Sequence, residues 1–160
     1  MKTTDSLSPA AGRVGVRVRA LLFFALTACA PATPPDLDTA KYAASLNVDI
    51  SASTKVAGMY IRDTTVGTGA AAASGQLVTM RYTGWLADGT QFDSNQAAGF
   101  QFRLGAGQVI QGWDVGVTGM QVGGARQLII PPSMGYGAEG TSGIPGNSIL
   151  VFNVTMLSSP

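Results

Sequence analysis

Apolar and polar residues alternate along the chain from residue 57 onward, with the two-residue period of a β-strand. Residues 59–66 form one such run, and the Gly67-Thr68-Gly69 sequence after it is typical of a turn. Residues 77–86 alternate in the same way. The residues that fall on one face of this second run are Val78, Met80 and Tyr82. Asp88-Gly89 then predicts a hairpin turn, because glycine adopts the positive φ that tight turns require.

The rest of the chain predicts three further strands and one helix. Alternating runs occupy residues 100–104 and 126–130, and a third covers residues 149–156, where Leu150, Phe152, Val154 and Met156 share one face. Residues 109–117 are the best helix candidate, although two glycines make this helix short and dependent on packing. The pattern predicts an α+β domain in which an antiparallel sheet of about five strands curls over one short helix.

The first thirty residues differ from the rest in character. Basic residues precede an uninterrupted apolar run at residues 20–26, which is much shorter than the roughly 20 residues of a membrane-spanning helix. Residues 26–29, Leu-Thr-Ala-Cys, resemble a bacterial lipobox, in which cleavage before the cysteine is followed by its lipidation. We therefore expect a signal peptide at residues 1–28, a lipid on Cys29, and a lipid-anchored location in the bacterial cell envelope. The alternative is that Cys29 is an ordinary small apolar residue.

Residues 30–36, directly after Cys29, are rich in proline and have no apolar period, whereas residues 37–46 could make a short helix. Such a proline-rich stretch is typical of an extended tether. The expected organisation is therefore a signal peptide over 1–28, a lipid-attached and flexible tether over 29–50, and a single folded domain over 51–160. All strands and the helix lie in that last part, so we expect the domain to be a monomer that folds without the first 50 residues.

Charge and composition exclude several classes of function. The chain beyond residue 28 holds six basic and eight acidic residues, a net charge of −2, and it has no basic stripe. Nucleic acid is therefore not an expected partner, because phosphate binding needs clustered Lys and Arg. The chain has no histidine, and Cys29 is its only cysteine. This removes Ser-His-Asp and Cys-His nucleophiles and most zinc sites, so no metal and no cofactor are expected.

One motif in the chain is misleading. Residues 135–140 match G-x-G-x-x-G, but a dinucleotide-binding loop must open a helix, whereas the sequence here continues as a loop. Any catalysis by this domain must therefore proceed without a titratable nucleophile or a metal.

Four blocks of sequence resemble the FKBP-type peptidyl-prolyl cis/trans isomerases, in the order and spacing of that family. They are residues 82–94, 100–105, 109–113 and 123–137, and Ile144-Pro145 with residues 150–152 extend the similarity over about residues 57–157. Four blocks in order are far more specific than any one of them. The segment between Tyr136 and Phe152 is about one residue shorter than in small members of the family, with Thr141 where a histidine is often found. The resemblance implies an FKBP-like fold.

The resemblance also implies an apolar pocket. Its walls are implied to be Tyr82, Phe92, Phe100, Val109, Ile110, Tyr136, Ile144 and Phe152, with Trp113 as the floor and Asp93 at the rim. In this scheme Asp93, Tyr136, Phe92 and Ile110 are catalytic and the others bind substrate. The Ile110 N–H and the Tyr136 hydroxyl would bind carbonyl groups beside the proline, and Asp93 would fix the pocket through a tyrosine hydroxyl such as that of Tyr82. Taken singly, each aromatic residue is more often ordinary core, and Asp93 could be a turn residue.

The implied activity is rotation about X-Pro bonds in envelope polypeptides, with macrolide inhibitors of the family as further ligands. An apolar pocket favours the twisted amide over the more charge-separated planar one, which requires no base. A proline-directed holdase with little turnover would use the same pocket and remains an alternative. A purely structural anchored lipoprotein is a third reading, which the number of pocket aromatics disfavours.

Overall fold

The computed structural model describes residues 33–159. Residues 1–28 and Cys29, where the signal peptide and the lipid are predicted, lie outside the described residues. Within the described part, six antiparallel strands form one sheet, in the order β1-β2-β5-β6-β3-β4. The strands are β1 (Thr54–Val56), β2 (Met59–Thr65), β3 (Leu77–Leu86), β4 (Gln91–Arg103), β5 (Ala125–Ile130) and β6 (Leu150–Ser158). The helices are α1 (Gln111–Val117) and the 3-10 turns η1 (Ala44–Leu46) and η2 (Pro132–Met134).

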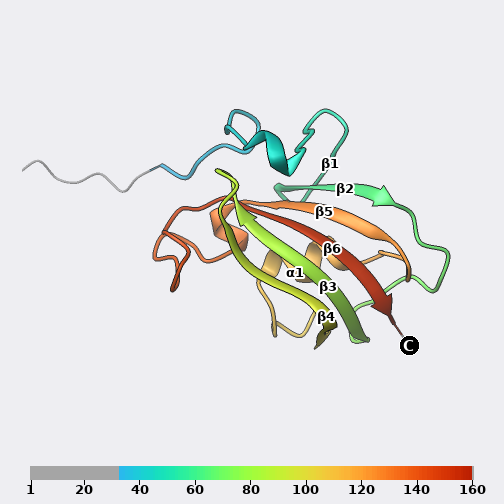
Figure 1. The fold of residues 1–160 in the computed structure, drawn as a ribbon. Coiled ribbons are helices and arrows are strands. Elements are labelled where there is room, and N and C mark those ends of the chain that lie inside the picture. Colours follow the sequence, from blue (N-terminus) through green and yellow to red (C-terminus); the bar gives the residue numbers. More distant parts are fainter. Residues whose placement is uncertain (1–32, 160) are drawn as a thin grey trace, which may run out of the picture. The chain divides into compact units, whose positions relative to one another are not determined.

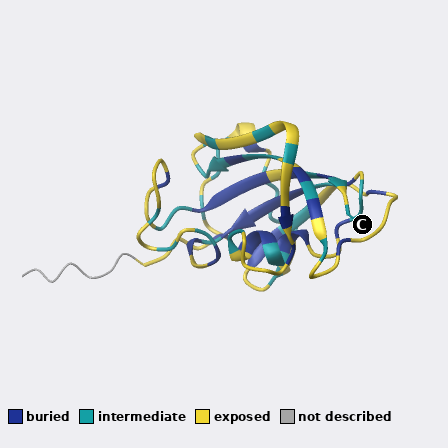
Figure 2. Cartoon of the chain, turned by 90° about the horizontal axis from the view of Figure 1, so that it is seen from below, coloured by how far each residue is buried: buried dark blue, intermediate teal, exposed yellow. Residues whose placement is uncertain are grey.

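The sheet curls around α1, and the main core lies between them (Figure 1). The side chains that fill this core alternate along the strands, as the two-residue period requires. Val78 and Met80 of β3 point inward, as do four alternate residues of β6 (Leu150, Phe152, Val154 and Met156). The α+β class with an antiparallel sheet over one helix is therefore confirmed. Figure 2 shows these inner strands and α1 as the most deeply buried part of the chain.

The two glycines that weaken α1 have a packing function. A Cβ at Gly112 would lie 2.5 Å from Cγ2 of Ile130, and one at Gly116 would lie 2.8 Å from Cδ2 of Leu128. At contacts this short the Ile130 and Leu128 side chains would have to shift, so glycine lets α1 approach β5 without displacing them. The two glycines thus lower the helix propensity of α1 but allow close contact between α1 and the sheet.

The strands differ from the prediction at two places. The short strand β1 adds a sixth member to the sheet, and β4 begins at Gln91 rather than near residue 100. The register between β3 and β4 shifts between the Tyr82–Asn95 and Met80–Phe100 pairs, so residues 96–99 bulge from the ladder. A bulge interrupts apolar alternation, which is why the first part of β4 is not visible in the pattern.

The flexible tether predicted for residues 29–50 does not extend past Leu37. Residues 37–50, which we call the N-terminal strap, fold onto the face of the sheet opposite to α1, where Leu37 and Leu46 are each 5% exposed. Residues of the strap, Leu37 among them, contribute to a second apolar cluster with Tyr60, Ile129 and Ile149. Of the short helix that residues 37–46 could make, only the 3-10 turn η1 is present, and the sequence pattern does not reveal how the strap packs on the sheet. The division at residues 28 and 50 itself stays a prediction.

Candidate functional site

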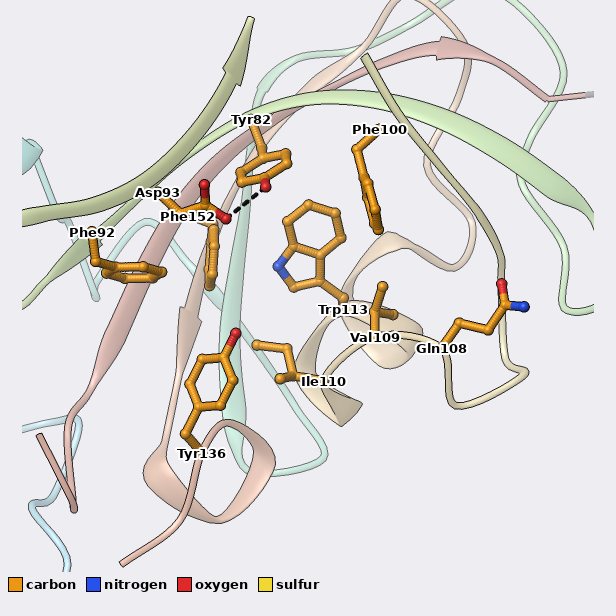
Figure 3. A pocket seen from close by; sticks show the side chains of 10 residues that line it. All are labelled: Tyr82, Phe92, Asp93, Phe100, Gln108, Val109, Ile110, Trp113, Tyr136 and Phe152. Carbon is orange, nitrogen blue, oxygen red and sulfur yellow. Dashed lines mark hydrogen bonds between the residues drawn. The ribbon is translucent and has the colours of Figure 1, made fainter. Parts of the chain in front are cut away.

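A cavity of about 260 Å³ opens beside α1 on the concave side of the sheet (Figure 3). It is lined by Tyr82, Phe92, Asp93, Phe100, Gln108, Val109, Ile110, Trp113, Tyr136 and Phe152. All the residues that the sequence analysis assigned to the pocket are present except Ile144, and Gln108 is added. Because these residues come from β3, β4, α1, β6 and two loops, the cavity exists only when segments that are far apart in the sequence come together.

Trp113 forms the floor of the cavity and is only 4% exposed. Its ring meets Tyr82 edge-to-face at a centroid distance of 5.0 Å and Phe152 in the same way at 5.4 Å. Such T-shaped pairs are favourable because the positive edge of one ring faces the negative face of the other. The indole nitrogen is buried without a hydrogen-bond partner among the described residues, and Figure 3 shows it turned toward Phe152. The floor is therefore rigid and almost entirely apolar.

Phe92 and Phe152 form one wall, and Gly84 makes their contact possible. The two rings lie 5.4 Å apart at an interplanar angle of 89°. A Cβ at Gly84 would come within 2.6 Å of Phe152 and 2.7 Å of Phe92, so a side chain here would displace the wall. This glycine, in the middle of β3, thus lets the two rings close against the sheet.

Within residues 33–159, Asp93 is the only carboxylate that lines the cavity. Its Oδ2 accepts a hydrogen bond of 2.7 Å from the Tyr82 hydroxyl, and its Oδ1 accepts one of 2.8 Å from the backbone N–H of Ser94. Burial and this bond to Asp93 raise the pKa of the Tyr82 hydroxyl well above its ordinary range. The expected Tyr82–Asp93 hydrogen bond is present, and it holds Tyr82 in its protonated, donating form.

The mouth of the cavity carries two partly exposed aromatic residues. Phe100 is 36% exposed and Tyr136 is 39% exposed. Figure 3 shows the Tyr136 hydroxyl directed into the cavity, on the same side as Ile110. Partial burial, with a smaller contribution from the charge of Asp93, raises the pKa of Tyr136. Its hydroxyl is therefore a stable hydrogen-bond donor at the entrance.

The positions of two residues differ from the prediction made from the sequence. Ile144 is 5% exposed and packs in the main core, and it is not among the residues that line the cavity. Gln108 lines the cavity, and its Oε1 accepts a hydrogen bond of 2.8 Å from the N–H of Arg103. No pattern in the sequence marks Gln108, since a single polar residue before an apolar pair is common in loops.

Asp114 on α1 holds the loop that leads to Val109 and Ile110. Its two carboxylate oxygens accept hydrogen bonds from the N–H groups of Gly105, at 2.8 Å, and Gly107, at 3.1 Å. Both glycines have positive φ, 75° and 66°, a conformation that glycine adopts without strain. In the sequence, only the spacing of Asp114 from these glycines pointed to this role. Spacing alone does not distinguish a carboxylate that anchors a loop from an ordinary carboxylate on a helix surface.

The chemistry available in the cavity is limited to packing and hydrogen bonding. Among the described residues, no group of three or more potential ligands is placed to hold a metal ion. The lining provides aromatic and aliphatic surface, one carboxylate engaged by Tyr82, and a hydroxyl at the mouth. Such a site can bind an apolar group and fix polar groups beside it.

Comparison with known proteins agrees with this geometry. The family model for the FKBP-type peptidyl-prolyl cis-trans isomerase matches residues 69–157, more than half of the chain. The chain belongs to this family. Phe92, Asp93, Trp113 and Tyr136 all lie inside the matched region, so the cavity is part of the FKBP-type domain.

Individual relatives support the same assignment. FK506-binding protein 4 of Emericella nidulans is 53% identical over 104 residues, which cover 64% of this chain and 22% of that protein. The crystal structure of AtFKBP13 matches with a TM-score of 0.62 and 36% identity, covering 71% of this chain and all of that one. FkpA from Escherichia coli matches with a TM-score of 0.63 and 35% identity, covering 68% of this chain and 51% of that one. The chain thus spans about a fifth of the length of the curated relatives it matches.

The same comparison corrects the predicted location. The FK506-binding proteins 3 and 4 that match at 48% to 53% identity are fungal and hence eukaryotic, so the assignment to a bacterial cell envelope is wrong. That assignment depended on the basic and apolar character of the first 26 residues and on the four residues ending at Cys29, and patterns this short recur by chance. Among residues 33–159, no helix is long and apolar enough to span a membrane.

Proposed function

We propose that this FKBP-type domain accelerates cis/trans rotation about X-Pro peptide bonds. The observation that supports the proposal is the cavity itself, in which an almost fully buried indole floor is surrounded by aromatic walls and contains no acid–base pair. Rotation makes and breaks no covalent bond, so a site without proton transfer suits it. The barrier is about 18 to 20 kcal/mol, and unaided rotation takes tens to hundreds of seconds.

The proposed mechanism is stabilisation of the twisted amide. The planar amide is charge-separated by resonance, and twisting about the C–N bond removes that resonance. An apolar cavity that excludes water therefore disfavours the planar ground state relative to the twisted transition state. Trp113 and the Phe92–Phe152 wall provide this apolar surface, and the closeness of their rings keeps water out.

The groups at the edge of the cavity are proposed to fix the peptide. The proline ring lies over Trp113, while the N–H of Ile110 and the hydroxyl of Tyr136 donate to carbonyl groups on either side of the proline. Tyr136 can do so because its hydroxyl points into the cavity and stays protonated. Holding both sides of the rotating bond reduces the entropy lost in reaching the transition state.

Asp93 is proposed to act on substrate through the shape of the rim and not through proton transfer. It fixes the hydroxyl of Tyr82, and Tyr82 in turn packs on Trp113. Phe100 and Val109 present apolar surface next to the floor, so the residue before proline is expected to be apolar. Macrolide inhibitors of the family are expected to compete for the same cavity, and the domain is expected to act as a monomer.

Exchange measurements on a proline peptide test this proposal. The full chain is added to a short peptide with Leu before Pro, and the cis–trans exchange rate is measured by NMR with and without a macrolide of the FK506 class. We expect acceleration that the macrolide abolishes. Suppression of aggregation of an unfolded protein, without faster exchange, would instead favour a holdase that uses the exposed Phe100 and Tyr136.

A further inference from the structure

The N-terminal strap is held on the sheet by polar contacts as well as by its apolar residues. On the β1–β2 side, Asp38 accepts hydrogen bonds from the Tyr60 hydroxyl and from Lys55 at 3.2 Å. The Tyr42 hydroxyl donates to the carbonyl of Leu37 at 2.9 Å, within the strap. These contacts fix the first half of the strap against the convex face of the sheet.

The second half of the strap is anchored to the central strands. The side chain of Gln127, which is 2% exposed, donates to the Leu46 carbonyl at 2.8 Å. Arg62 donates to the carbonyl of Asn47 at 2.7 Å. The same amide nitrogen also donates to Asn153 at 3.2 Å, so departure of the strap would cost Gln127 one of its two acceptors, and detachment is unfavourable.

Between these anchors, the strap contacts the turn that joins β3 and β4. The N–H of Ala43 donates to the carbonyl of Ala87 at 2.8 Å. A Cβ at Gly89 would lie 2.9 Å from Cβ of Ala43 and 3.3 Å from Oγ of Ser45, so the strap passes directly over this turn. Ala87 itself packs partly buried against the apolar cluster beneath the strap.

The turn leads directly into the wall of the cavity. The N–H of Leu86 donates to the carbonyl of Thr90 at 2.9 Å, which closes the hairpin. Phe92 and Asp93 are the second and third residues of the strand that follows. A displacement of the turn is therefore transmitted over two or three residues of extended backbone to Phe92 and Asp93, on the opposite face of the sheet.

We propose that the N-terminal strap is a positioning element for the proposed active site, acting through Ala43 and the β3–β4 turn on Phe92 and Asp93. The expected effect on catalysis rests on the proposed function. The structural coupling between the strap and the β3–β4 turn does not depend on that function. The strap does not touch substrate. It fixes the position of the β3–β4 hairpin, and the hairpin fixes the positions of the aromatic wall at Phe92 and of the rim carboxylate of Asp93.

Ala43→Pro in the full chain isolates this contact. Proline removes the one N–H that bonds to Ala87, and the φ of −60° and ψ of 137° at Ala43 are values that proline adopts without strain. Ala43→Ser keeps the N–H and is the matched control. Tyr60→Phe removes one of the two hydrogen bonds to Asp38, leaving that of Lys55, and keeps the turn contact, so it controls for loosening of the strap away from the turn.

Two readouts distinguish the outcomes. We expect Ala43→Pro to lower kcat/KM for a Leu-Pro peptide about three- to tenfold, below the roughly hundredfold effect of a full 1 Å misplacement. We expect hydrogen exchange at the Leu86 and Gly89 amides, both bonded within the hairpin, to become at least about threefold faster. Ala43→Ser and Tyr60→Phe should leave both quantities within about twofold of the original chain.

Failure of this inference and failure of the proposed function can be told apart. If the original chain does not accelerate exchange of the peptide, the proposed function is wrong, and the hydrogen-exchange measurement still tests the coupling. If folded Ala43→Pro keeps both its hairpin protection and its kcat/KM, the strap does not position the hairpin. An equal loss of kcat/KM in Tyr60→Phe would also overturn the proposal, because a general effect of strap stability would then explain it.

Discussion

The hydroxyl of Tyr82 donates a 2.7 Å hydrogen bond to Asp93, and the ring of the same tyrosine meets Trp113 at 5.0 Å. One side chain thus connects the rim carboxylate to the floor of the cavity. Asp93 is also held by the N–H of Ser94, so both of its oxygens are engaged. The carboxylate is therefore suited to orienting its neighbours, and this use requires no change in its protonation.

Replacing Tyr82 with Phe tests the connection. The ring and its contact with Trp113 remain, while the hydrogen bond to Asp93 is lost, so we expect kcat/KM to fall by about two- to twelvefold. The value of kcat/KM is obtained from the cis–trans exchange rate of a Leu-Pro peptide, measured by NMR. Tyr42→Phe is a suitable control, because the Tyr42 hydroxyl bonds to Leu37 on the other face of the sheet. Unchanged activity of Tyr82→Phe would show that Asp93 does not act through this tyrosine.

Shortening the side chains of the wall is expected to have larger effects. Phe92→Ala opens the apolar wall to water and Asp93→Ala frees the rim, so each should lower kcat/KM by more than about tenfold. Tyr136→Phe removes one donor at the mouth and should lower it by about two- to twelvefold. Phe92→Ala also destabilises the fold, by less than the about 3 to 5 kcal/mol of a fully buried ring, because Phe92 is partly buried. Circular dichroism must therefore show each variant to be folded, and full activity in folded Phe92→Ala and Asp93→Ala would exclude this cavity as the catalytic site.

The pH dependence follows from the two tyrosines. The pKa values of Tyr82 and Tyr136 are both raised above 10.0, chiefly by burial, so both hydroxyls remain donors across the neutral range. The stability that they contribute is fully present below pH 10.0 and is lost as the pH rises through their raised pKa values. With no histidine in the chain, kcat/KM should be constant from about pH 5 to about pH 9. A bell-shaped profile in this window would contradict catalysis without proton transfer.

Removal of the N-terminal strap should destabilise the domain. A chain that begins at Ser51 lacks Leu37 and Leu46 and exposes Ile129 and Ile149, which are 1% and 5% exposed in the intact fold. Burial of two leucines contributes about 3 to 6 kcal/mol, so urea unfolding should show a loss of this size relative to a chain beginning at Ala32. Leu46→Ala in the full chain should lose about 2 to 5 kcal/mol. Equal stability of the two shortened chains would show that the strap is not part of the folded domain.

The sequence predicted those parts of the fold in which each residue's environment repeats with a regular period. Residues in β3 and β6 alternate because one face of each strand lies on α1, and this order is visible without coordinates. The strap shows no such regular alternation, since its apolar residues Leu37, Val48 and Ile50 meet the second apolar cluster at irregular intervals. The beginning of β4 is hidden for a similar reason, because the bulge at residues 96–99 breaks its alternation.

The site was predictable to the extent that its members are aromatic and occur in ordered blocks. Ile144 was placed in the pocket by its position in those blocks, yet the structure buries it in the core. Gln108 and Asp114 were missed because their effect is on loop geometry, through hydrogen bonds to the backbone of Arg103, Gly105 and Gly107. Contacts between a side chain and a distant N–H leave no periodic trace in a sequence.

The glycines of α1 connect ligand binding to the folding of the whole domain. A seven-residue helix that contains Gly112 and Gly116 is unstable on its own in water, and it forms only where β5 receives it. Trp113, carried by that helix, therefore reaches its place only after the sheet has assembled. A peptide or macrolide that needs this indole binds the fully folded chain alone, so its binding energy protects every strand at once. Occupancy of the cavity would then shift the midpoint of global unfolding as a single cooperative event, with no separately melting subdomain around the site.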